Sequence, residues 1–200
     1  MKFYYGNAAD PTFAVYLDGD VCRPVFLEKY GDAAIPFDPM MQEITHLKTV
    51  EALNKYLHPY ADGKQKVYMA GPLFNEGDRY CNQILSDTLR EAGYTTFLPQ
   101  EVVIDKDSTL LVKAACFYMD LKAIKQCDYL LANCNGIEID SGTAAEIGLG
   151  YGLGKKMLAY KSDVRNYYNE TFRLNNFVGG LIDNRICTTP KEALLMLQTL

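Results

Sequence analysis

The chain has 200 residues, of which 48% are hydrophobic and 22% charged, as is ordinary for a soluble globular protein. Its formal net charge of −5 and pI of about 5.1 argue against nucleic-acid binding, which requires a basic surface. No apolar run approaches the roughly 20 residues that cross a bilayer, and the N-terminus lacks the apolar stretch of a secretory signal. We therefore expect a cytoplasmic protein that binds neither nucleic acid nor membrane.

The cysteines and histidines do not form a metal-binding or disulfide pattern. The six cysteines include no CxxC pair, and several lie inside apolar stretches: Cys22, Cys81, Cys116, Cys127, Cys134 and Cys187. We interpret them as reduced, mostly buried thiols. His46 and His58 have no metal-ligand spacing with each other or with a cysteine. We therefore predict no metal site.

The N-terminal part of the chain, residues 1–62, is rich in Asp, Pro, Gly and aromatic residues. Stretches 13–17 and 25–27 predict the two strands of a hairpin, and residues 43–57 predict a helix. No residue here suggests chemistry. We interpret this part as a small extension of unknown role that precedes an α/β domain at residues 63–200.

Strand and helix patterns alternate from residue 66 onward. Short apolar stretches bounded by Gly or Pro predict strands at 66–70, 94–98, 129–132 and 156–160. Apolar residues at helical spacing predict helices at 78–92, 109–126 and 143–153. Thr189-Pro190-Lys191-Glu192 is typical of a helix start and predicts a C-terminal helix. Helix 109–126 should bury Leu110, Ala114, Phe117, Leu121 and Ile124.

This alternation predicts a doubly wound α/β fold, Rossmann-like or flavodoxin-like, with a parallel sheet and helices on both of its faces. Ligands of such folds bind beyond the carboxyl ends of the strands. The functional site should therefore involve three loops, at residues 71–77, 99–108 and 133–143.

The most informative stretch follows a buried strand and opens a helix. Asp140 lies in its loop and Glu146 early in its helix, so the two carboxylates can face one pocket. Gly142 between them lets the backbone approach a ligand closely. The positive end of the helix dipole helps to keep Glu146 ionised, and an ionised carboxylate can attack a sugar carbon.

Two other interpretations of this stretch remain open. Thr143-x-x-Glu146 is also a capping box, a common structural motif. The second interpretation is a phosphate-binding loop at the helix N-terminus. However, the loop has no Lys or Arg, and the chain contains neither GxxxxGK[ST] nor GxGxxG.

Asp120 and Tyr68 are further candidates. Asp120 lies three residues after Phe117, at the border of the apolar face of its helix, where a carboxylate needs partners. A surface ion pair with Lys113 or Lys122 is the structural alternative. Tyr68 ends the first strand of the α/β domain, just before Ala70-Gly71, and taken alone it fits a core aromatic better than a catalytic residue.

Four motifs, in this order and spacing, resemble the nucleoside 2-deoxyribosyltransferases over roughly residues 66–185. They are Val67-Tyr68-Met69-Ala70-Gly71-Pro72-Leu73-Phe74, Asp120-x-x-x-Ile124-x-x-x-Asp128, Asp140-x-Gly142-Thr143-x-x-Glu146-Ile147-Gly148 and Gly154-Lys155-Lys156. The resemblance does not cover the N-terminal extension.

The resemblance implies a role for each matching residue. Glu146 would be the nucleophile, and the hydroxyl of Tyr68 would orient it. Asp140 would bind or protonate the base, and Asp120 would hold the sugar hydroxyls. The substrate-binding set would further include Phe74, which lines the base pocket, together with Gly71, Gln100 and Gly142.

The family also borrows an asparagine from a neighbouring subunit to bind the 5′-hydroxyl, which implies a homo-oligomer with shared active sites. Asn175 or Asn176 would take that place. The substrates would be a deoxynucleoside and a free nucleobase, exchanged in purine or pyrimidine salvage. The reaction would be a retaining double displacement through a deoxyribosyl ester of Glu146, without metal or cofactor.

Two alternatives to this function remain. A deoxynucleoside 5′-monophosphate N-glycosidase would have to hold a phosphate, which Glu138 and Asp140 would repel although Arg79 could bind it. A non-catalytic nucleotide or nucleotide-sugar sensor would use the same sheet and bind its ligand without turnover.

Overall fold

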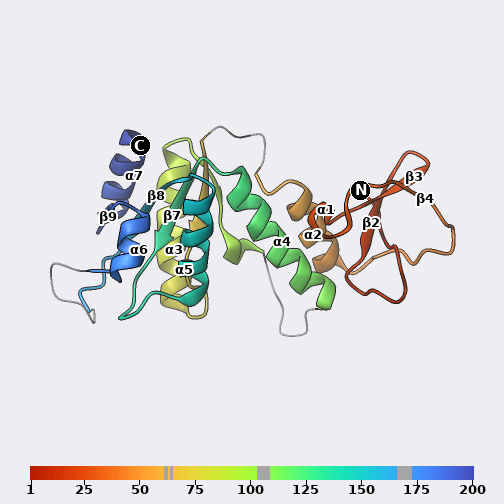
Figure 1. Cartoon of the computed structure of the whole chain (residues 1–200), viewed down its shortest axis with the longest axis horizontal. Coiled ribbons are helices and arrows are strands. Elements are labelled where there is room, and N and C mark those ends of the chain that lie inside the picture. The colour runs from red at the N-terminus through yellow and green to blue at the C-terminus, as the bar shows by residue number, and fades with distance from the viewer. Residues whose placement is uncertain (61–62, 64, 103–108, 166–172) are drawn as a thin grey trace. The chain divides into compact units, whose positions relative to one another are not determined.

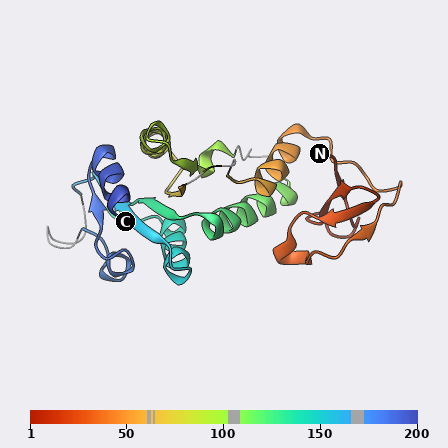
Figure 2. The same cartoon turned by 90° about the horizontal axis from the view of Figure 1, so that it is seen from above.

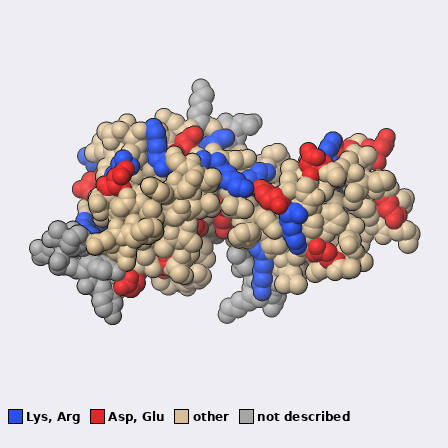
Figure 3. Space-filling view, in the orientation of Figure 1, with Lys and Arg blue, Asp and Glu red and all other residues tan. Residues whose placement is uncertain are grey.

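The structure, a computed structural model, describes residues 1–60, 63, 65–102, 109–165 and 173–200. The chain splits into two compact units. The first unit comprises residues 1–59 and 102–122, and the second comprises residues 60–101 and 123–200. Figure 1 colours both along the chain, and Figure 3 shows Lys and Arg interspersed with Asp and Glu on the visible face of each. The predicted domain boundary after residue 62 stays a prediction.

The first unit contains a four-stranded antiparallel sheet in the order β1-β2-β3-β4. Its strands are β1 Phe3–Tyr5, β2 Ala14–Asp18, β3 Val21–Pro24 and β4 Ile35–Pro36. Two helices follow its strands in the chain, α1 Leu27–Tyr30 and α2 Leu47–Leu57. Tyr4, Val15 and Cys22 form the buried cluster of the sheet.

Two predicted elements of the first unit need correction. The hairpin is present, but its second strand is Val21–Pro24 rather than 25–27, because Val25 and Phe26 turn into the core ahead of α1. The predicted helix at 43–57 begins only at Leu47. Glu43 instead bridges to β1, and the amide of Ile44 donates to the carbonyl of Phe3.

The second unit is built on a five-stranded parallel sheet in the order β6-β5-β7-β8-β9. Its strands are β5 Lys66–Ala70, β6 Thr95–Phe97, β7 Tyr129–Asn133, β8 Lys156–Tyr160 and β9 Ile186–Cys187. Helices α3 Glu76–Glu91 and α7 Pro190–Thr199 cover one face, and α5 Ser141–Gly152 and α6 Asn176–Leu181 cover the other (Figure 2). A 3-10 turn, η1, spans Pro99–Glu101. The predicted flavodoxin-like fold is confirmed.

Small errors in the predicted elements have local causes. α3 starts two residues before the predicted helix because Asn75 caps it. A short helix, α6, begins at Asn176 although the sequence pattern predicted no helix there, and residues 166–172 before it lie outside those that the structure describes. β9 was not predicted because two residues are too short for a pattern.

The long helix α4, Leu110–Gln126, contributes residues to both units. Its predicted apolar face is wrong in part, because Leu110 and Phe117 are 61% and 62% exposed. Apolar residues occur around most of the helix, so spacing alone did not single out one face. The buried face is Leu111, Val112, Ala115, Met119, Ala123 and Ile124. Within the described ranges, no helix has the length and apolarity needed to cross a membrane.

Candidate active site

A tyrosine–carboxylate pair joins β5 to α5 in the second unit. The hydroxyl of Tyr68 donates a hydrogen bond of 2.6 Å to Oε1 of Glu146. Tyr68 is fully buried in the middle of β5 rather than at its end, and its ring stacks on Phe97 at 5.6 Å. The ring is therefore held rigidly, and its hydroxyl fixes the direction of the half-buried carboxylate.

Asp140, and not Thr143, caps helix α5. Its Oδ2 accepts hydrogen bonds from the backbone N–H of Thr143 at 3.0 Å and from its hydroxyl at 3.3 Å. The capping-box alternative is therefore wrong, because Glu146 lies six residues after the cap and meets Tyr68 instead. The dipole effect is concentrated in the first helical turn, so it acts on Asp140 more than on Glu146. A Cβ at Gly142 would lie 3.0 Å from Oδ2 of Asp140.

Buried amide side chains connect the three loops that the sequence selected. Nδ2 of Asn82 donates to the carbonyl of Pro72 at 2.8 Å and to Oε1 of Gln100 at 3.3 Å. Oδ1 of Asn82 accepts a bond of 2.7 Å from Asn133, which ends β7. Asn82 and Asn133 are 4% and 1% exposed. Neither was predicted, although Asn82 is a polar residue on the apolar face of its helix.

Gly71 and Gln100 belong to this amide network. A Cβ at Gly71 would lie 2.8 Å from Oδ1 of Asn82 and 2.9 Å from Cβ of Asn133, so only glycine fits between them. Nε2 of Gln100 donates to the carbonyl of Arg79 at 2.8 Å. Close packing thus explains why residue 71 is a glycine, and the side chain of Gln100 is held by hydrogen bonds within the protein. The contacts of both residues with substrate stay predictions.

The remaining predicted residues of the second unit lie at its surface. Phe74 is 78% exposed. Asn175 caps α6, where its Oδ1 accepts a bond of 2.9 Å from the amide of Phe177, and Asn176 is the exposed first residue of that helix. The role of these asparagines in a neighbouring subunit stays a prediction.

Asp120 lies in α4, in the part assigned to the first unit, and is half-buried. Burial, assisted by the Asp120 carboxylate, raises the pKa of Cys116 to about 11. Lys122, one of the two alternative ion-pair partners, donates to the carbonyl of Leu57 at 3.1 Å, and its Nζ lies 4.5 Å from the ring centroid of Tyr56. The predicted contact of Asp120 with a sugar stays a prediction.

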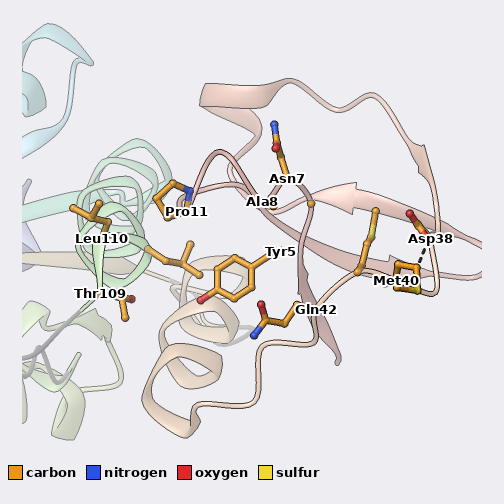
Figure 4. A pocket seen from close by; sticks show the side chains of 12 residues that line it. Tyr5, Asn7, Ala8, Pro11, Asp38, Met40, Gln42, Thr109 and Leu110 are labelled. Atoms are coloured by element: carbon orange, nitrogen blue, oxygen red, sulfur yellow. Dashed lines mark hydrogen bonds between the residues drawn. The ribbon is translucent and has the colours of Figure 1, made fainter.

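The first unit also contains a cavity of about 610 Å³ (Figure 4). Its lining includes Tyr5, Gln42, Met40 and Leu110, and none of the residues selected from the sequence. Its size suits a small ligand, but Asp38 is the one carboxylate among the described residues that line it. The cavity therefore offers no pair of acid and base. Across the described residues, no group of three or more His, Cys, Asp or Glu could hold a metal ion.

Comparison with known proteins places these features in context. The model of the family described as nucleoside 2-deoxyribosyltransferase matches residues 67–186, more than half of the chain. No curated protein matches.

Solved structures match over about two thirds of the chain. A conserved protein from Enterococcus faecalis V583 is 26% identical, with a TM-score of 0.58, over 68% of this chain and 99% of its own. The 2-deoxyribosyltransferase of Bacillus psychrosaccharolyticus is 23% identical, with a TM-score of 0.53, over 66% of this chain and 95% of its own. Both share the fold of the second unit.

Proposed function

The chain belongs to the nucleoside 2-deoxyribosyltransferase family, and from this premise we propose that it transfers 2-deoxyribose between nucleobases through a covalent ester on Glu146. The family is enzymatic and acts by glycosyl transfer or N-glycosidic cleavage. The observation that carries the finer proposal is the 2.6 Å hydrogen bond from the buried Tyr68 to Glu146. A nucleophile reacts efficiently only when it is correctly oriented, and this hydrogen bond orients the carboxylate of Glu146.

In the first step, a carboxylate oxygen of Glu146 forms a bond to the anomeric carbon as the bond from that carbon to the base nitrogen breaks. The electron pair stays on the base, which takes up a proton. In the second step, a nitrogen of another free base attacks the anomeric carbon, loses its proton and releases the carboxylate. Two inversions give net retention. A missing 2-hydroxyl favours this route, because that group would withdraw electrons from the cationic transition state.

Asp140 is proposed to act on the base. Both of its bonds to Thr143 use Oδ2, and among the described residues Oδ1 accepts no hydrogen bond. This oxygen can bind the base or orient the water that protonates it. Its capping bonds hold the carboxylate at the start of the helix that carries Glu146.

The other substrate contacts follow the family pattern. Asp120 holds the sugar hydroxyls, and Phe74 and Gln100 face the base. Asn175 or Asn176 binds the 5′-hydroxyl of a neighbouring subunit in a homo-oligomer. The proposed substrates are a deoxynucleoside and a free nucleobase, as in purine or pyrimidine salvage, and the proposed steps use no cofactor.

The test combines a base-exchange assay with trapping of the intermediate. The protein is mixed with deoxyadenosine and a second free base, products are separated by chromatography, and acid-quenched protein is weighed by mass spectrometry. We expect exchange, and one deoxyribosyl group on a peptide containing Glu146. Glu146→Gln should abolish both, whereas Glu138→Gln, a change in the loop before α5, should preserve both.

Four outcomes would contradict the proposal. Full exchange by the Glu146→Gln variant, or a sugar on another side chain, would remove Glu146 from its role. Base release from deoxyadenosine 5′-monophosphate without an acceptor base, in the absence of exchange, would identify a hydrolase instead. Binding of deoxyadenosine without turnover would identify a sensor.

A further inference from the structure

Lys161 is a buried charged residue for which the proposed mechanism has no role. It follows β8 directly, is 1% exposed, and its backbone N–H donates to the carbonyl of Cys187 at 2.9 Å. Burying an ammonium group costs several kcal/mol unless other groups compensate for the lost water. The groups around Lys161 must therefore compensate for the loss of water around its ammonium group.

The ammonium group of Lys161 binds the backbone of the loop that leads to Asp140. Its Nζ donates to the carbonyl of Gly136 at 2.7 Å and to that of Cys134 at 3.1 Å. Burial lowers the pKa of Lys161, and the nearby carboxylate of Asp163 opposes this shift. The bonds thus hold two positions of the loop after β7 against the end of β8.

Asn135 makes the reciprocal connection. Its Oδ1 accepts bonds of 2.9 Å from the backbone N–H groups of Ser162 and Asp163. Gly136 follows with a φ of 111°, a left-handed conformation that favours glycine. The loops after β7 and β8 are therefore joined in both directions just before the chain reaches Asp140.

We propose that Lys161 is a positioning residue that fixes residues 134–140 and, through them, places Asp140 for its action on the nucleobase. This inference rests on the proposed function, because it concerns the geometry of the same site. An ammonium group can bind two carbonyls at once from outside the loop. Neutral side chains of similar length cannot supply the same charge-assisted bonds.

The chain offers a matched control at the opposite, amino ends of the strands of the same sheet. Lys155 precedes β8, and its Nζ donates to the carbonyls of Lys125 and Cys127, both at 2.7 Å. It makes the same type of double contact, but at the amino ends of the strands. Lys155→Met therefore removes an equivalent pair of bonds far from Asp140 along the strands.

The experiment compares Lys161→Met with Lys155→Met in the full chain. Hydrogen exchange by mass spectrometry follows peptides covering residues 134–142, and base exchange between deoxyadenosine and a free base gives kcat and KM. For Lys161→Met we expect faster amide exchange at 134–142 and a kcat reduced about 100-fold, with a smaller change in KM. For Lys155→Met we expect both properties to stay near those of the unchanged protein.

The proposal is overturned if amide exchange at 134–142 is unchanged in Lys161→Met, or if both variants lose kcat equally. Should Lys161→Met not fold, Lys161→Gln replaces it, and unchanged exchange and kcat in that variant overturn the proposal. If the unchanged protein does not exchange bases, the proposed function fails, while the hydrogen-exchange comparison still decides whether Lys161 fixes the loop.

Discussion

The five-stranded sheet has an amino edge, where the amino ends of its parallel strands lie, and a carboxyl edge, where their carboxyl ends lie. At the amino edge, Nζ of Lys155 donates to two backbone carbonyls, and Asp128 accepts a hydrogen bond of 2.8 Å from the backbone N–H of Lys66. At the carboxyl edge, Lys161 also binds two carbonyls, but there the neighbouring polar side chains bind one another. Asn82 joins Asn133 in this way.

The difference between the edges lies in what the polar side chains hold. At the amino edge they form hydrogen bonds with backbone N–H and C=O groups near the starts of the strands, and these bonds stabilise the fold. At the carboxyl edge they also connect the loops after the strands to one another. If the proposed function holds, similar bonds serve stability at one edge and the placement of the proposed reactive groups at the other. Variants that match the two edges can test this distinction.

The largest effect is expected from Tyr68→Phe. This variant keeps the ring stacked on Phe97 and removes the hydrogen bond to Glu146. Because the proposed nucleophile, Glu146, would lose its orientation, we expect kcat for base exchange to fall about 100-fold. The control is Tyr129→Phe near the amino edge, for which kcat should stay within about twofold. Equal losses in both variants would show that the hydroxyl of Tyr68 has no special role.

A smaller effect is expected from Asn82→Asp. The variant replaces a donor by a carboxylate oxygen that faces the carbonyl of Pro72 and Oε1 of Gln100. We expect the free energy of unfolding in urea to fall by about 2–3 kcal/mol. Asp128→Asn at the amino edge keeps an acceptor for Lys66 and should cost less than about 1 kcal/mol. The network would be unimportant if the two costs were the same.

The smallest effect concerns two thiols at the two ends of β7. Burial raises the pKa of Cys127, at the amino edge, to about 11 and that of Cys134, at the carboxyl edge, to about 12. A raised pKa in the folded state gives stability that is complete below pH 9 and is lost as the pH rises through the folded value. We expect iodoacetamide to modify Cys127 before Cys134 as the pH is raised from 8. Mass spectrometry of digested protein measures the order, and modification of Cys134 first would contradict it.

The sequence predicted the sheet well where its signals are local. β5 and β8 match their predicted bounds because apolar runs there end at Gly or a polar residue. The face of α4 was harder, because Leu110 and Phe117 are apolar yet exposed. Its spacing offered several faces, and only the packing of the folded chain selects one.

The candidate site was predictable in its motifs but not in its connections. Tyr68 and Glu146 stand in stretches that the family pattern identifies. A cap on α5 by Thr143 was left as an open alternative, and the structure shows that Asp140 makes the cap. Asn82 was not predicted because its role depends on a hydrogen bond with Asn133 at the end of β7, and the sequence alone does not show that the two residues meet.

The order of the strands has a consequence for synthesis of the protein. Tyr68 and its carboxylate partner are 78 positions apart, and β7 pairs with β5 although β6 comes between them in the chain. The pair can form only after the ribosome has released β7 and all of α5. A nascent chain that ends before Ser141 therefore lacks Glu146 and cannot form this hydrogen bond.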